Sequence, residues 1–269
     1  MIAVELRKLF RRPRTWAALF LLVALPTLVA VLVDVTRLTP RPGEGPAFLS
    51  AVLDNGSLFG VAALAIVLPL FLPISVAVIA GESIAGEAQG GTLRYLLARP
   101  VGRTKLLVAK LVAVFAFVAV AVVLVAGSGF LVGRLLFGVS AVPASTFSGT
   151  TLTSQQILVR SALAIAYVIV SMLSIAAIAL ALSTATDSPL SATLGALALL
   201  IGSSLLLTLD AAGSLRPYLP TRYWLSFVDL FREPVLWRNV ERGVLLQLVY
   251  VLVLLGIGWA NFTSKDITS

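Results

Sequence analysis

The sequence contains no cysteine and no histidine. Without cysteine there is no disulfide and no thiol chemistry, and without either residue there is no zinc site of the common Cys/His type and no haem-attachment motif. The missing histidine also removes the side chain that most often serves as a general base. A Ser–His dyad and a His-Glu-x-x-His motif are therefore excluded. The apolar stretches also contain no aspartate pair, and we expect the chain not to be an enzyme.

Charge is also scarce. Charged residues make up 12% of the 269 residues, 59% are hydrophobic, and the mean hydropathy is +1.04. Ordinary soluble domains carry about 25% charged residues, so this composition is typical of a membrane protein. The net charge of +8 would suggest nucleic acid in a soluble protein. Here it indicates Lys and Arg that flank membrane helices, and we expect a lipid bilayer and no nucleic acid as partner.

Long apolar stretches dominate what remains. A helix needs about 20 residues to cross a bilayer, and alternating barrel strands would not give runs of this length. The charged residues inside these stretches, Lys110 and Arg160, both lie near an end, and we expect Lys110 to snorkel to the interface. Pro26, Pro69 and Pro73 interrupt spans. The sequence predicts six transmembrane helices, near 15–33, 57–80, 108–133, 158–182, 189–209 and 244–262.

The residues before the first span form their own pattern. Apolar side chains recur at helical spacing from Ile2 to Phe10, and most of the rest are charged. This pattern predicts a short amphipathic helix with a basic face suited to lipid headgroups, followed by a bend at Pro13. The polar residues that we assign to the membrane interface are Glu5, Arg7, Lys8, Arg11 and Arg12.

Basic residues also set the orientation. The Lys and Arg residues are divided almost evenly between the two sides, but the two dense clusters without matching acids lie on the side of the N-terminus. The positive-inside rule places that side in the cytoplasm, and six spans then place both termini there. The first apolar run is longer than a usual signal sequence and lacks a clear cleavage site, so we expect it to be retained.

Two helix starts carry capping signals. Thr153 and Gln156 fit a capping box at the start of the fourth span. Ser188 followed by Pro189 fits an N-cap and first-turn pair, which starts the fifth span after a very short turn.

Segment 210–243, on the outer side, is the most unusual connection. Its aromatic residues fall on one helical face, and Pro217, Pro220 and Pro234 divide it. We expect short helices that lie at, or dip into, the outer interface. Two interpretations remain open, an aromatic belt that anchors the protein in headgroups and an outer gate over a translocation path. The residues assigned to this gate or interface are Tyr223, Trp224, Phe227 and Phe231.

A basic loop between the second and third spans carries the clearest motif. It has a Glu before Gly-Thr-Leu, a Leu-rich turn, Pro-x-x-Arg, and a Lys that enters the third span. This pattern resembles the first cytoplasmic loop of ABC-2 type transporter permeases, the membrane-spanning subunits of ATP-binding-cassette exporters. The N-terminal amphipathic helix and the six-span layout are similar to that family too. The matching residues are Glu87, Gly91, Thr92, Leu93, Leu96, Leu97, Pro100, Arg103 and Lys110.

The resemblance implies an all-α integral membrane protein that is one subunit of an exporter. Such permeases form dimers with a second copy or a paralogue, bind cytoplasmic ABC ATPase subunits through a coupling helix in this loop, and lie in the bacterial plasma membrane. The chain has no P-loop, so it would hold no cofactor, and ATP and Mg would be bound by the partner ATPase.

In domain terms, we expect a single transmembrane domain over 1–269. Within it lie an elbow helix at 1–14, a cytoplasmic coupling loop at 81–104 and the outer segment at 210–243. In the coupling loop, Glu87 could begin a short helix, where an acid complements the helix dipole. The residues assigned to ATPase coupling are Glu82, Glu87, Gly91, Thr92, Leu93, Arg94, Leu97, Pro100 and Arg103.

Other functions remain open at this stage. The basic loop could be a plain positive-inside anchor, although Glu82, Glu87, the Gly90-Gly91 pair and Pro100 are not needed for that. The chain could be a stand-alone channel or secondary carrier, which the prolines within its spans permit. It could also be a sensor or scaffold subunit that binds an ATPase without transporting. The substrate is not readable from the sequence.

Overall fold

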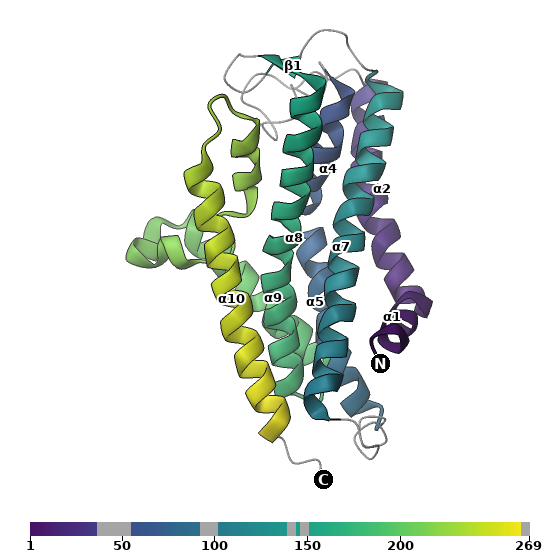
Figure 1. Ribbon diagram of the computed structural model, residues 1–269, viewed down its shortest axis with the longest axis vertical. Coiled ribbons are helices and arrows are strands. Elements are labelled where there is room, and N and C mark those ends of the chain that lie inside the picture. Colours follow the sequence, from purple (N-terminus) through teal and green to yellow (C-terminus); the bar gives the residue numbers. More distant parts are fainter. Residues whose placement is uncertain (37–54, 92–101, 139–143, 146–150, 265–269) are drawn as a thin grey trace.

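The computed structural model describes residues 1–36, 55–91, 102–138, 144–145 and 151–264. Within these residues the chain is a bundle of long helices whose axes run roughly along one direction (Figure 1). Six helices are long and apolar enough to cross a membrane, which confirms the all-helical fold class. They are α2 (Pro13–Thr36), α5 (Phe71–Gln89), α7 (Arg103–Leu136), α8 (Ser154–Ala185), α9 (Pro189–Thr208) and α10 (Trp237–Ser264).

Shorter elements complete the fold. Strands β1 and β2 pair over two residues each, with Ala144 opposite Leu152. The shorter elements are α1 (Ile2–Arg11), η1 (Gly56–Leu58), α4 (Phe59–Val67), β1 (Ala144–Ser145), β2 (Thr151–Leu152), η2 (Asp210–Tyr218) and η3 (Trp224–Phe231).

Helix α8 is the central helix of the bundle. It packs against α5, α7, α9 and α10, and most of its apolar span is buried. Its start has the predicted capping box, in which the Thr153 side chain accepts from the backbone of Gln156 and the Gln156 side chain accepts from the backbone of Thr153. The start of α9 is also as predicted, with Ser188 as the N-cap and Pro189 in the first turn. Local capping chemistry therefore places the ends of both helices.

The second span is broken, and this corrects the prediction of one helix near 57–80. Helix α4 ends at Val67, a turn follows, and α5 begins at Phe71 and continues to Gln89. Pro69 lies in the turn, where the missing N–H and the restricted residue before it disfavour a continuous helix. Pro73 lies in the first turn of α5. The N–H groups of a first turn have no acceptor within the helix, so a proline there loses no helical hydrogen bond. In Figure 1, α4 and α5 follow one another along the length of the bundle.

Helix α4 and the preceding η1 touch α7 almost backbone to backbone. A Cβ atom built on Gly133 of α7 would lie 2.2 Å from the carbonyl oxygen of Gly56. A Cβ atom on Gly129 would lie 2.7 Å from the Cβ of Ala63. Small residues therefore permit the close helix contact that is common within membranes.

The connection between α9 and α10 consists of 3-10 helices, as the prediction of short helices implies. Hydrogen bonds from three spans hold it: Tyr167 of α8 donates to the Tyr223 carbonyl at 2.5 Å, and Gln247 of α10 donates to the Pro220 carbonyl at 2.8 Å. The Ser203 hydroxyl of α9 lies 2.7 Å from that of Thr221. Figure 1 shows η2 projecting sideways from the bundle and η3 beside the first part of α10. Residues 237–243 belong to α10, so the outer segment is shorter than predicted.

Candidate functional site

The N-terminal helix α1 packs one face on the bundle. Helix α1 ends at Arg11, the backbone is extended at Arg12, and α2 begins at Pro13, so the predicted elbow helix and bend are confirmed. The side chains that face the protein are Glu5, Lys8, Leu9 and Arg12, a helical spacing of three and four residues, whereas Arg7 and Arg11 are exposed. The basic residues of α1 therefore divide between the protein and the surroundings, and do not form the single headgroup-facing set that the sequence predicted.

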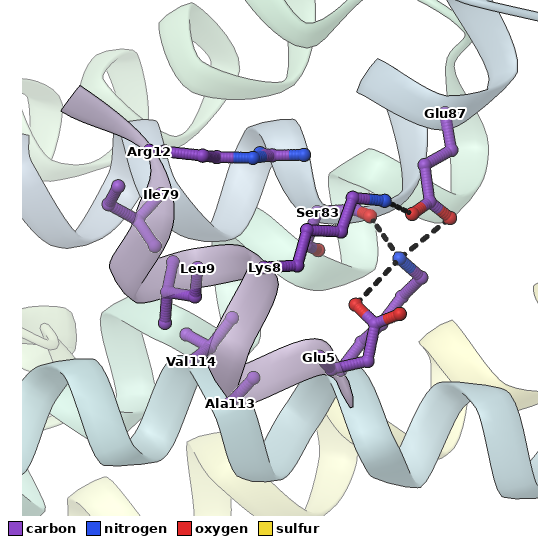
Figure 2. A pocket seen from close by; sticks show the side chains of 10 residues that line it. Glu5, Lys8, Leu9, Arg12, Ile79, Ser83, Glu87, Ala113 and Val114 are labelled. Atoms are coloured by element: carbon purple, nitrogen blue, oxygen red, sulfur yellow. Dashed lines mark hydrogen bonds and ion pairs between the residues drawn. The ribbon is translucent and has the colours of Figure 1, made fainter. Parts of the chain in front are cut away.

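Two of the α1 side chains form a compact set of ion pairs with one residue of α5 and one of α7 (Figure 2). We call this set the ion cluster; its members are Glu5 and Lys8 of α1, Glu87 of α5 and Lys110 of α7. The Lys110 ammonium lies 2.7 Å from Glu87 Oε2 and 3.4 Å from Glu5 Oε2. It also donates to the Ser83 carbonyl at 2.8 Å. Lys8 donates to the other carboxylate oxygen of Glu87. Two acids and two bases thus pair across three helices.

The centre of the ion cluster is withdrawn from solvent. The side chains of Lys110 and Glu87 are only 2% and 4% exposed. The prediction that Lys110 snorkels to the interface is wrong, because its charge is matched inside the protein by Glu87 and Glu5. Breaking such a buried pair on one side leaves an uncompensated charge at a cost of about 3–5 kcal/mol. The cavity beside the cluster measures about 30 Å³, enough for about one water molecule and no larger ligand.

The position of Glu87 is a second correction. The sequence placed it at the start of a short helix in the loop, but it lies in the last turn of α5. Helix α5 ends at Gln89, two residues after Glu87; the Gly90 N–H then bonds to the Gly86 carbonyl, and Gly91 takes a positive φ of 67°. Glycine is the residue that tolerates this helix-ending conformation. The predicted loop 81–104 therefore starts at Gly90, and the hydrogen-bonding needs of the helix end explain the Gly90-Gly91 pair.

Other predicted coupling residues lie nearby. Glu82 of α5 pairs with Arg14 at 2.5 Å and with Arg12 at 3.8 Å. These pairs link the bend after α1 to α5, the helix that also carries Glu87. Arg103 begins α7 and donates to the Thr263 carbonyl in the last turn of α10 at 2.8 Å. The remaining predicted coupling residues lie outside the described residues: Thr92, Leu93, Arg94, Leu97 and Pro100.

The predicted outer residues are brought together by η3. Trp224, Phe227 and Phe231 are buried against the bundle, and Tyr223 is half-buried. Their burial comes from packing on α8 and α10.

Sequence reasoning missed an open cavity of about 240 Å³ on the side of the bundle, which we call the mid-bundle cavity. It lies where the turn between α4 and α5 meets α9 and the first residue of η3, Trp224. The prolines of the second span were the signal for the break. Nothing in the sequence indicated that α9 and Trp224 would lie beside it.

Among the described residues, no group of three or more His, Cys, Asp or Glu side chains could hold a metal ion.

Comparison with known protein families gives a match over most of the chain. The family model described as "Protein of unknown function (DUF2705)" matches residues 27–268. No curated protein matches the chain. The matched region begins within α2 and contains the other five candidate spans and the outer segment, whereas α1 lies before it.

Proposed function

The chain belongs to the DUF2705 family of proteins of unknown function, and we propose that this multi-pass membrane protein is the membrane-spanning subunit of an ATP-driven exporter. In this proposal it pairs with a second copy or a paralogue and docks cytoplasmic ATPase subunits through the basic loop between α5 and α7. The partner ATPase binds ATP and Mg, and this chain catalyses nothing. The end of the bundle that carries α1 faces the cytoplasm of a bacterial cell.

The observation that carries the proposal is the ion cluster. It joins α1 to α5, which enters the loop, and to α7, which leaves the loop. A partner that pushes on the loop would therefore move both helices together with α1, because separating them exposes buried charges. Helix α5 begins at the break in the second span, so such a movement would reach the mid-bundle cavity directly.

A stand-alone secondary carrier is the second candidate. The broken second span supports it as well, since discontinuous helices near the middle of the membrane often form substrate sites in such carriers. The ion cluster favours the exporter, because it is located at the loop and away from the break. The two candidates differ in whether an ATPase is bound.

The test is purification of the tagged chain in mild detergent with identification of what elutes with it. We expect a P-loop ATPase in stoichiometric amount, with ATP hydrolysis that depends on this chain. Lys105→Glu reverses an exposed charge in the first turn of α7 beside the loop, and we expect it to lower the bound ATPase several-fold. Arg238→Glu makes the same charge change in the first turn of α10, at the opposite end of the bundle.

The control Arg238→Glu should leave the amount of bound ATPase unchanged. Elution of the chain alone or only with further copies of itself, from cells that retain its transport activity, would contradict the exporter and favour the carrier.

A further inference from the structure

The bend between α1 and α2 borders a cavity of about 360 Å³, which we call the bend cavity. Its walls come from the bend itself, the last turns of α5 and the first residue of α9. Because α2, α5 and α9 are all candidate membrane spans, the cavity lies where three spans meet one face of the membrane, at the depth of the lipid headgroups. The lining residues include Arg12, Pro13 and Arg14 at the bend, Glu82 and Gln89 of α5, and Pro189 of α9.

The two arginines of the bend cavity have unused hydrogen-bond donors. Within the described residues the Arg12 guanidinium makes no hydrogen bond, and Glu82 Oε2 lies 3.8 Å from it. Arg14 donates to the other carboxylate oxygen, Glu82 Oε1, at 2.5 Å. A guanidinium carries five N–H donors, so each arginine retains several. Two guanidiniums at one cavity suit the oxygens of a phosphate group, which arginine binds through paired, charge-assisted hydrogen bonds.

The bend cavity also contains a carboxylate. The Glu82 side chain is 18% exposed, and in the part of the chain that the structure describes no group donates a hydrogen bond to its Oε2 atom. A phosphate alone would place a second negative charge beside this carboxylate. A ligand with both a phosphate and an ammonium group presents an opposite charge to each side of the cavity. The Arg14–Glu82 pair does not oppose such a ligand, because an exposed ion pair contributes little to stability and rearranges at small cost.

We propose that the bend cavity binds the headgroup of a phospholipid that carries a primary ammonium beside its phosphate, as phosphatidylethanolamine does. The phosphate accepts hydrogen bonds from Arg12 and Arg14, and the ammonium donates to Glu82. The cavity volume equals that of roughly twelve water molecules in the liquid, which is enough for such a headgroup. Helix α2 continues from the cavity into the membrane with exposed apolar side chains at Trp16 and Phe20, along which acyl chains can lie.

The test compares three dioctanoyl phospholipids on the delipidated chain, purified in detergent without an ATPase, with bound lipid measured by native mass spectrometry. Phosphatidylethanolamine and phosphatidylcholine have the same net charge, but the trimethylated nitrogen of the choline lipid has no N–H donor. Phosphatidylglycerol has the phosphate and no cation. We expect the ethanolamine lipid to bind about tenfold more tightly than either of the others, which corresponds to one charge-assisted hydrogen bond. An affinity equal to or below that of either other lipid would overturn the proposal.

Three variants assign the preference to the bend cavity. Glu82→Gln removes the partner of the ammonium, so the ethanolamine lipid should fall to the affinity of the choline lipid. The choline lipid should bind as before, which shows that the variant is folded. Arg12→Gln should weaken both lipids about tenfold, because each presents the same phosphate.

The matched control is Arg7→Gln, which removes the same charge from an exposed position of α1 that does not line the bend cavity. It should leave all three affinities unchanged. An ethanolamine preference that survives Glu82→Gln would overturn the proposal. A loss of affinity in Arg7→Gln as large as in Arg12→Gln would also overturn it, since general attraction to a basic helix would then explain the binding.

A water-soluble ligand is distinguished with phosphoethanolamine, which has the same two charges and no acyl chains. Apolar burial along α2 adds to the affinity of the lipid, so we expect no measurable binding of phosphoethanolamine at concentrations that saturate the lipid. Equal affinity would overturn the assignment to a lipid. The inference is independent of the proposed exporter, because lipid binding needs no ATPase. Loss of the lipid preference with an ATPase still bound would refute this inference alone, whereas a chain that keeps the preference and binds no ATPase would refute only the exporter.

Discussion

At the scale of single residues, the ion cluster is the most consequential feature of this chain. Lys110 and Glu87 are almost fully enclosed, and each compensates the buried charge of the other. Arg14 and Glu82 form a pair of similar length nearby, but the Arg14 side chain is 73% exposed. Water and ions screen exposed pairs, so pairs of this kind contribute little to stability. The ion cluster holds α1, α5 and α7 together because its central pair is buried, and not merely because opposite charges meet there.

Lys110→Met tests the contribution of the ion cluster. The variant removes the buried partner of Glu87 and leaves the half-exposed Lys8 beside it, so we expect a loss of about 3–5 kcal/mol of stability. The measurement is the temperature at which the detergent-purified chain loses its monodisperse elution. Lys105→Met changes an exposed lysine of the same helix and should alter stability by no more than about 0.5 kcal/mol.

The double variant Lys110→Met/Glu87→Leu sharpens this test, because it removes both central charges and leaves Glu5 and Lys8 on α1. It should recover most of the lost stability, since an apolar pair carries no desolvation penalty. A Lys110→Met variant as stable as the wild type would show that the buried pair does not hold α5 and α7 together.

At the scale of elements, the packing of η1 and α4 on α7 determines where the outer half of the second span lies. The break between α4 and α5 makes α4 a short helix of its own, too short to be stable in isolation. It is held by the close approach of its backbone to α7 at Gly56, Gly129 and Gly133. Pro26 shows that proline alone does not decide such a break, because α2 runs through it without ending.

Gly133→Val tests this contact. The added Cβ would lie 2.2 Å from the Gly56 carbonyl oxygen and 2.4 Å from the Phe59 Cβ, so α7 and η1 must separate. We expect a stability loss of about 1–3 kcal/mol or more from overpacking, read from thermal unfolding in detergent. Gly127→Val on the same helix meets no atom within 4 Å and serves as the control. Equal stability of the two variants would mean that α4 does not depend on this contact.

At the scale of the whole molecule, α1 and the ion cluster lie toward one end of the helical bundle, and η2 projects from its side (Figure 1). Helix α1, the start of α7 and the end of α10 gather at one end, and the β1–β2 pair and the start of α8 lie at the other (Figure 1). The proposed orientation places the first end in the cytoplasm.

Because the natural sequence has no cysteine, single cysteines report this orientation without background. Ala3, Gln155 and Ser264 are exposed positions at the two ends. A membrane-impermeant maleimide should label Gln155→Cys in intact bacterial cells. It should label Ala3→Cys and Ser264→Cys only after the cells are permeabilised. The reverse pattern would place α1 and the basic loop outside the cell, where no ATPase could bind them.

The sequence by itself determined that the chain has six long apolar helices, although not the break in the second span, and it determined the amphipathic α1 with its bend at Pro13 and the helix starts at Thr153 and Ser188. Each of these depends on hydropathy or hydrogen bonds within a few neighbouring residues, so a local pattern suffices. Only the tertiary structure decided which charges pair and which side chains surround a cavity. Lys8 and Glu87 are 79 positions apart, and Trp224 and Pro69, also far apart in the sequence, line the same cavity. Such contacts follow from how the helices pack, and packing is set jointly by all of the spans. For the same reason Glu87, predicted on a loop surface, lies at the end of α5 and inside the protein.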